Sequence, residues 1–194
     1  MALAPMLPQN FITLRDFVRN DLTQILSSAK PPNYSAAILV CIASEAIGKL
    51  LGRKADESVF IRDLLGQYRI PHVIGRSIFN AVRNGLAHFY ETKNIVISGE
   101  ELEVVISWRQ YTHLKVYKRD WRNDGINRPG LCLNVHTLCS DLHAFLMTVE
   151  SRVIQSKKLR RQMEKHANSV TRRERTPAKH EKVWRQFIHN SSET

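Results

Sequence analysis

Residues 33–52, NYSAAILVCIASEAIGKLLG, contribute most to deciding the fold. Apolar and small side chains recur here at helical spacing and cover much of the helix circumference, which is typical of a helix buried at the centre of a bundle. Pro31 and Pro32 end the preceding segment, and Gly52 marks the C-terminal stop. The sequence therefore predicts a helical protein built around this stretch.

Apolar residues follow helical spacing on both sides of the central stretch. They predict helices at residues 10–29, 56–65 and 73–88. A longer helix is expected from about residue 134, because apolar residues three and four positions apart form one stripe as far as residue 153. We therefore expect four or five helices packed together as a bundle.

The periodicity changes before the long helix. Residues 95–98 and 101–108 surround Gly99 and are rich in β-branched side chains, which predicts a β-hairpin. A third strand fits residues 114–117, and residues 119–130 read as a loop. The expected fold class is mainly α, with a small β-hairpin insertion at about residues 95–117 before the last long helix.

Basic side chains are concentrated near the C-terminus. The 194 residues carry a formal net charge of +11. Residues 157–194 hold 11 Lys and Arg against 4 Asp and Glu, a net of +7, and residues 1–156 hold the remaining +4. We expect a helical domain at 1–156 and a basic C-terminal extension at 157–194, which is either a solvated helix or a surface for nucleic acid. The candidate phosphate contacts in the extension are Lys157, Lys158, Arg160 and Arg161.

The cysteines and apolar runs indicate the cellular compartment. Three cysteines without a C-x-x-C pair do not form a disulfide framework, so a cytoplasmic location is expected. The first residues lack the basic start and apolar core of a signal peptide. The longest apolar run, residues 36–43, is too short to cross a bilayer. We therefore expect no membrane association.

Cys132, His136, Cys139 and His143 follow one another at spacings that would place them on one face of a helix. Both residue types are zinc ligands. Along a straight helix, however, the four would span about 16 Å, at 1.5 Å per residue, which is too far for a single ion. We interpret them as a flank of the core, and expect neither a metal nor another cofactor.

The motif best suited to chemistry is Arg83-Asn-Gly-Leu-Ala-His88. Five helical steps turn about 140°, so Arg83 and His88 would flank one groove, and Gly85 could loosen the helix and let them converge. An imidazole can accept a proton from a ribose 2′-OH, and a guanidinium can hold phosphate oxygens, with Asn84 orienting either group. These groups suit phosphodiester cleavage without a metal. An arginine and a histidine that merely stabilise a helix C-terminus are the alternative.

This motif, followed by the aromatic residues Phe89 and Tyr90, resembles the R-x4–6-H signature of HEPN domains, the higher eukaryotic and prokaryotic nucleotide-binding superfamily. Residues 35–47, small and apolar with an internal Glu45, are similar to a helix of that family. The resemblance covers residues 10–92 and 134–155. It implies an antiparallel helical bundle and a homodimer in which two motifs meet across the interface. Many members are metal-independent endoribonucleases of toxin–antitoxin, CRISPR or phage-defence systems, and others are non-catalytic adaptors.

We therefore expect a metal-independent endoribonuclease that acts on RNA as a toxin or phage-defence effector, with an antitoxin or a nucleotidyltransferase as a candidate partner. His88 is the expected acid and base, Arg83 the phosphate ligand and Asn84 the orienting group. Glu45 is expected to pair with a base, Arg83 being the candidate, because a buried carboxylate without a partner is costly. Tyr90 either stacks on a base or belongs to the core. The alternative function is a non-catalytic adaptor that binds nucleic acid or protein.

Overall fold

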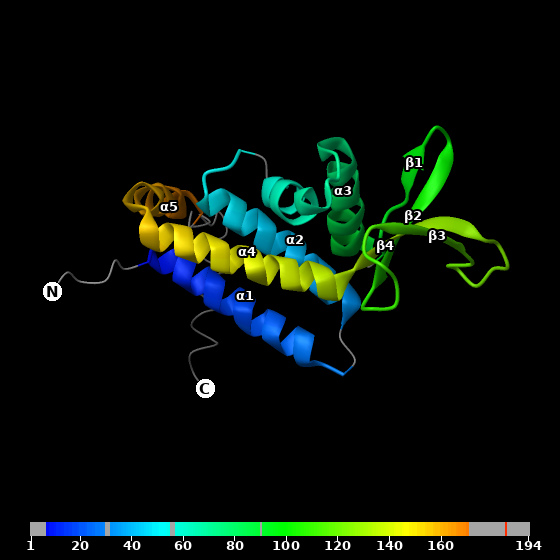
Figure 1. The fold of residues 1–194 in the computed structure, drawn as a ribbon, viewed down its shortest axis with the longest axis horizontal. Helices are drawn as coiled ribbons and strands as arrows, with labels where there is room; N and C mark the ends of the chain where they lie inside the picture. Colours follow the sequence, from blue (N-terminus) through cyan, green and yellow to red (C-terminus); the bar gives the residue numbers. More distant parts are fainter. Residues whose placement is uncertain (1–6, 30–31, 55–56, 90, 171–184, 186–194) are drawn as a thin grey trace.

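A computed structural model of the chain describes residues 7–29, 32–54, 57–89, 91–170 and 185. The prediction of a mainly α fold is confirmed, and Figure 1 shows the long helices side by side with the sheet at one end. The helices are α1 (Gln9–Ser27), α2 (Asn33–Leu50), the π-helix η1 (Phe60–Leu65), the 3-10 helix η2 (Gly66–Tyr68), α3 (His72–Phe89), α4 (Val135–Gln155) and α5 (Lys157–Val170). The strands are β1 (Ile95–Ile97), β2 (Glu100–Ser107), β3 (Lys115–Arg119) and β4 (Arg128–Asn134).

Helix α2 is the centre of the bundle, as its sequence predicts. It packs against α1, α3, α4, α5 and β2. Val40, Cys41 and Ile47 in its middle are fully buried. The predicted ends of the helix also hold, since α2 stops at Leu50 and Gly52 takes a left-handed conformation with φ of 70°. Every other helix in this description is therefore positioned by its contact with α2 or with a neighbour of α2.

The inserted sheet is larger than the predicted hairpin. Its strand order is β1-β2-β4-β3, with β1 and β2 antiparallel, β2 and β4 parallel, and β3 and β4 antiparallel. The predicted hairpin and third strand are present, but residues 128–130, expected in a loop, begin β4, and the insertion continues to Asn134 rather than ending near residue 117. Val104 and Leu131 are partners in register and bury one face of the sheet in the core.

The expectation that Cys132, His136, Cys139 and His143 lie on one face of a helix is wrong, because the first of them belongs to strand β4. Cys132 lies in β4 and His136 near the start of α4, so the four side chains do not share one helical face. Cys132 and Cys139 are buried, and burial raises the pKa of the Cys139 thiol to about 12. Within the described ranges, no group of three or more His, Cys, Asp or Glu side chains could hold a metal ion.

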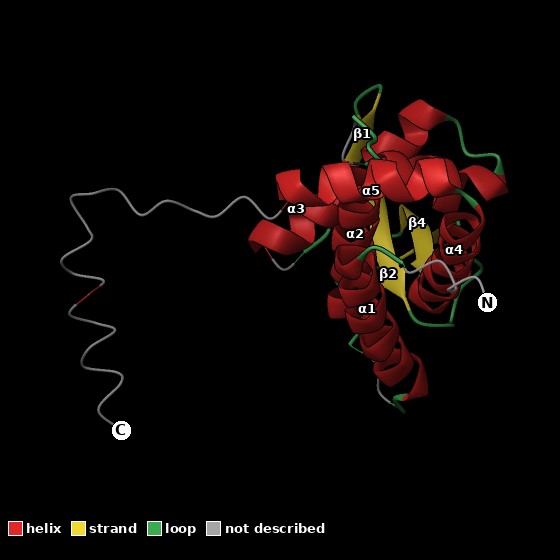
Figure 2. Cartoon of the chain, turned by 90° about the vertical axis from the view of Figure 1, so that its left-hand side faces the viewer, coloured by secondary structure: helices red, strands yellow, loops and turns green. Residues whose placement is uncertain are grey.

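The basic extension begins as a packed helix. The expected boundary after residue 156 falls at the turn into α5, but α5 returns across the end of α2, as Figure 2 shows. Met163 and Ala167 are 0% and 4% exposed, and Gln162 Nε2 donates to the Leu51 carbonyl at 2.9 Å. The first part of the extension is therefore attached to the bundle. Residues 171–184 and 186–194 lie outside the described residues. No described helix is long and apolar enough to cross a membrane.

We predict that Met163→Ala lowers the free energy of unfolding by about 2–5 kcal/mol, the usual cost of truncating a fully buried side chain. Lys165→Ala, which changes an exposed side chain of the same helix, should change it by less than about 0.5 kcal/mol. Urea denaturation followed by circular dichroism measures both. Equal effects of the two substitutions would contradict the docking of α5 on α2.

Candidate functional site

Arg83 projects from α3 toward α2, where it meets Glu45. Its Nε donates a hydrogen bond to Glu45 Oε1 at 3.0 Å, which confirms the pairing expected from the sequence. The Glu45 side chain is 14% exposed and the Arg83 side chain 35% exposed. Beside them lies Cys41, whose thiol pKa is raised by burial and further by the Glu45 carboxylate, whereas the Arg83 charge lowers it. The pair thus joins the two helices at the edge of the core.

The contact with Glu45 occupies only part of the guanidinium. A guanidinium carries five N–H donors in a planar fork, and the bond to Glu45 uses the one on Nε. Within the described part of the chain, the two Nη groups of Arg83 have no hydrogen-bond partner. Glu45 therefore fixes the plane of the fork, and the fork keeps the donors that bind carboxylate or phosphate oxygens in bidentate fashion.

Gly85 does not loosen the helix, contrary to the expectation from the sequence. Helix α3 continues without a break to Phe89. The chain then reverses, and the Lys93 N–H donates to the Ala81 carbonyl at 3.0 Å. A Cβ at position 85 would lie 2.2 Å from the Glu91 carbonyl oxygen. Gly85 is therefore the position that lets the returning backbone pass close to the helix.

A regular helix places positions 83 and 88 about 140° apart around the axis. Between them lies a strip of α3 on which Asn80 and Ala87 are exposed and Asn84 is half-buried. Positions 83 and 88 thus lie on either side of this strip, and the convergence of their side chains on one groove stays a prediction. The side chain of His88 and the whole of Tyr90 lie outside the described residues.

The four candidate phosphate contacts lie on α5, which packs mainly against α2, α4 and α1 rather than against α3, the helix of this motif. Helix α5 contacts the C-terminal end of α2 at Leu51, whereas Leu86 of α3 shares a small pocket with Tyr34 at the N-terminal end of α2. The 18 residues of α2 separate these two ends, and the contact of Arg83 with Glu45 lies between them. In Figure 1, α5 and the sheet accordingly lie at opposite ends of the molecule.

The four cations also differ among themselves. Arg160 Nη1 donates to the carbonyls of Val153 and Ile154 at 2.8 and 2.6 Å, so its charge caps the C-terminus of α4. Lys157, Lys158 and Arg161 are exposed. Arg160 therefore stabilises the turn between the helices, and the other three remain free to meet solvent.

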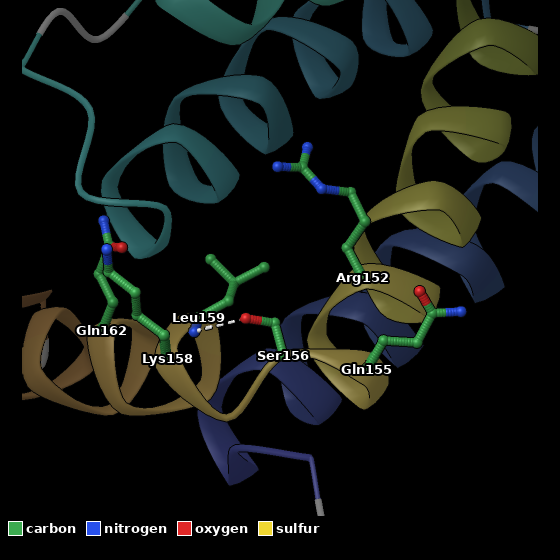
Figure 3. Close-up of a pocket in the computed structure, with 6 residues that line it drawn as sticks. All are labelled: Arg152, Gln155, Ser156, Lys158, Leu159 and Gln162. Atoms are coloured by element: carbon green, nitrogen blue, oxygen red, sulfur yellow. Dashed lines mark hydrogen bonds between the residues drawn. The ribbon is translucent and has the colours of Figure 1, made fainter.

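A pocket of about 320 Å³ lies at the turn between α4 and α5. Figure 3 shows Arg152 and Gln155 coming from α4, and Lys158 and Gln162 from α5. Ser156 Oγ accepts a hydrogen bond from the Leu159 N–H at 3.2 Å, which caps the start of α5. The pocket is open to solvent, and Arg152 and Lys158 line it. The hydrogen bond between Ser156 and Leu159 stabilises the turn between the two helices rather than forming a binding site.

A larger groove, of about 550 Å³, lies beside the end of α3. The Glu103 carboxylate in it is 7% exposed and pairs with Arg122 Nε at 2.7 Å. Sequence reasoning missed this groove, because two of its side chains come from the stretch interpreted as a loop. Its lining consists of Tyr34, Glu91, Thr92, Lys93, Asn94, Glu103, Val104, Trp121 and Arg122.

Two histidines on the sheet side, His113 and His136, have pKa values below the ordinary histidine value. Burial lowers the pKa of His113 to about 4, and its Nδ1 accepts a hydrogen bond from the Asn134 N–H at 3.1 Å. Burial and the Arg109 charge also lower the pKa of His136. Both rings stay neutral at pH 7 and serve the junction of the sheet with α4.

The comparisons with known proteins found no match: no family model, no curated protein and no solved structure matches this chain. A functional assignment therefore rests on its residues and their geometry.

We predict that Gly85→Ala destabilises the protein by about 1–3 kcal/mol, the usual cost of overpacking. An unobstructed Gly→Ala change in a helix would instead stabilise it by up to about 1 kcal/mol. Gly66→Ala is the control, because the nearest atom to its Cβ would be the Ile61 carbonyl oxygen at 3.4 Å. Thermal unfolding of the wild type and both variants measures these changes in stability. A Gly85→Ala protein as stable as the wild type would refute the close passage of residues 91–93 over the helix.

Proposed function

We propose that the chain is a HEPN-type, metal-independent endoribonuclease whose site lies at the end of α3. The observation that carries the proposal is the Glu45–Arg83 pair, in which a largely buried carboxylate orients a guanidinium and leaves its Nη groups available. The same helix bears His88 five positions later, across a strip of exposed surface. A proton carrier and an oriented phosphate ligand are the groups that this reaction requires.

In the proposed reaction, His88 accepts the proton of a ribose 2′-OH, and the 2′-oxygen attacks the neighbouring phosphorus. The 5′-oxygen leaves with a proton, so the products end in a 2′,3′-cyclic phosphate and a 5′-OH. The Arg83 fork binds the non-bridging oxygens, on which negative charge increases in the transition state. Asn84, half-buried between the two positions, orients the phosphate or the imidazole.

A homodimer would supply a second histidine, so that one imidazole serves as base and the other as acid. The surface that fits a second copy is a row on α2 leading toward Glu45, formed by Tyr34, Ile38 and Ile42 at steps of four. Tyr34 is 44% exposed and Ile42 52% exposed, and exposed apolar rows of this kind mark interaction surfaces. In this arrangement two Arg83 side chains face one cleft. As a cytoplasmic toxin or phage-defence effector, such a dimer would be restrained by an antitoxin or a nucleotidyltransferase.

A non-catalytic adaptor is the second candidate, and the Glu45–Arg83 pair also favours it. An ion pair at the edge of a helical core can serve only to fix the packing of two helices. The adaptor would bind RNA or a partner protein without cleaving it. The two candidates differ in whether position 88 must be a histidine.

We predict that the protein scatters light as a dimer of about twice 22.4 kDa at micromolar concentration. Ile42→Glu should shift it to the monomer, because a charge in an apolar interface is costly. Ile126→Glu is the control, since Ile126 is a 55% exposed apolar residue in the loop between β3 and β4, outside α2. A wild-type monomer at all concentrations would rule out the composite site.

We predict that His88→Ala and Arg83→Lys each lower RNA cleavage by about 10²-fold or more, the usual scale for acid–base and electrostatic catalysis. Arg83→Lys keeps a cation beside Glu45 but loses the planar fork. His72→Ala is the matched control, because His72 is an exposed histidine at the first position of the same helix, sixteen residues before His88. The assay is gel analysis of labelled RNA in EDTA, with identification of the cyclic phosphate and with 2′-deoxy RNA as a resistant substrate.

Cleavage that requires a divalent metal, or a His88→Ala protein that cuts like the wild type, would refute the mechanism. Binding of RNA without cleavage by the wild type would support the adaptor instead.

A further inference from the structure

Residues 108–119, WRQYTHLKVYKR, hold four Lys and Arg and three Trp and Tyr without a single Asp or Glu. The proposed function assigns nothing to them. In the structure they form the loop before β3 and β3 itself, which is an edge strand of the sheet. This edge strand therefore presents basic and aromatic side chains to which the proposed function gives no role.

Side chains alternate along a strand, so Lys115, Tyr117 and Arg119 point to one face of the sheet. The Arg119 guanidinium lies 5.0 Å from the centre of the Tyr111 ring, and its Nη1 donates to the Tyr111 hydroxyl at 3.0 Å. The Tyr111 ring is 5.1 Å from the Tyr117 ring and 5.5 Å from the Trp121 ring. These five residues form what we call the aromatic–cationic face.

The positive charge of this face is not compensated. Among the described residues, neither Lys115 nor Arg119 has a carboxylate partner. Two neighbouring arginines behave differently, since Arg122 pairs with Glu103 and Arg128 with Asp124. The cations beside the rings are therefore the ones left for an anionic ligand.

Trp121 connects the face to the groove beside α3. Its indole contacts Tyr111 on one side and lines the 550 Å³ groove on the other. A Cβ at Gly130 would lie 2.4 Å from the indole Nε1, so the glycine in β4 makes room for the ring against the sheet. Residues 91–94 line the same groove and follow directly after α3. The rings thus lead from the edge strand toward the end of α3.

We propose that the aromatic–cationic face binds single-stranded RNA. The rings of Tyr111, Tyr117 and Trp121 provide surfaces for stacking bases, and Lys115 and Arg119 contact the phosphates. Single strands fit and duplexes do not, because paired bases hide the surfaces that stack on rings. The proposal rests on the proposed function in taking RNA as the ligand, but binding at this face does not require cleavage.

The test compares variants of the full chain by fluorescence anisotropy with a labelled uridine oligomer. Lys115→Gln should weaken binding severalfold and lower the slope of log affinity against log salt by about 0.7, the value for one phosphate contact on a single strand. Lys118→Gln is the matched control, because Lys118 lies three residues away on the opposite face of β3 and is also exposed. It should change affinity less than about twofold, on the scale of a screened, more distant charge.

A second pair of variants tests stacking separately from charge. Tyr111→Leu should lower affinity by about tenfold, the scale of one base–aromatic stack, and leave the salt slope unchanged. Tyr111→Phe keeps the ring and should bind like the wild type. Melting temperatures of all variants confirm that each protein is folded.

Three outcomes would overturn the proposal: equal weakening by Lys115→Gln and Lys118→Gln, binding of duplex RNA as tight as that of the single strand, or binding of a polyglutamate peptide as tight as that of RNA.

Failure of the proposed function would give a different set of results. If the wild type never cuts RNA but Lys115→Gln and Tyr111→Leu lose binding, the face is supported and the nuclease is not. If cleavage occurs and these variants bind and cut normally, only the face is refuted.

Discussion

The burial of α2 is the constraint on which the rest of the structure depends. Five small residues of this helix, among them Ala36, Ser44 and Gly48, are buried, and small side chains let neighbouring helices approach closely. The Ser44 hydroxyl donates to the Val40 carbonyl at 2.6 Å and so satisfies its hydrogen bond inside the helix. Glu45 is the one acidic residue of α2, and its carboxylate must find a cation to offset its desolvation. The position of Arg83 therefore follows from the same packing that forms the core.

The end of α3 is one of the places where the helices and the sheet are joined, besides the contact of α2 with β2 and the passage from β4 into α4. The backbone of residues 91–93 passes over Gly85, and Thr92 Oγ1 donates to the Val104 carbonyl in β2. These contacts fix the last turns of α3, which carry Arg83 and position 88, against strand β2. This junction explains why an insertion absent from a minimal helical bundle bears directly on the candidate site.

The local sequence pattern was sufficient to predict the positions of the helices and the hairpin, because these depend on the periodicity of apolar residues. It also predicted the Glu45–Arg83 pair, because a buried carboxylate needs a cation nearby. It was insufficient for β4, whose residues Pro129 and Gly130 are typical of turns and whose parallel pairing with β2 joins segments far apart in the sequence. The sequence of α5 left a solvated extension as one interpretation, because its docking depends on few apolar residues, Leu159, Met163 and Ala167, among many polar ones. The close passage over Gly85 is likewise a tertiary contact, and a helix pattern contains no sign of it.

Net charge alone would place nucleic acid along the whole basic extension, but the contacts of the cations separate their functions. Arg160 caps a helix, and Arg122 and Arg128 are neutralised by carboxylates. Among the described residues, α5 and β3 each carry several exposed cations, and the two elements lie at opposite ends of the molecule (Figure 1). The β3 group adjoins, through Trp121, the groove that residues 91–94 line directly after α3. Under the proposed function, we expect the face on β3 to lead single-stranded RNA toward the end of α3, because Trp121 and residues 91–94 line one groove, and α5 to add phosphate contacts that do not depend on sequence.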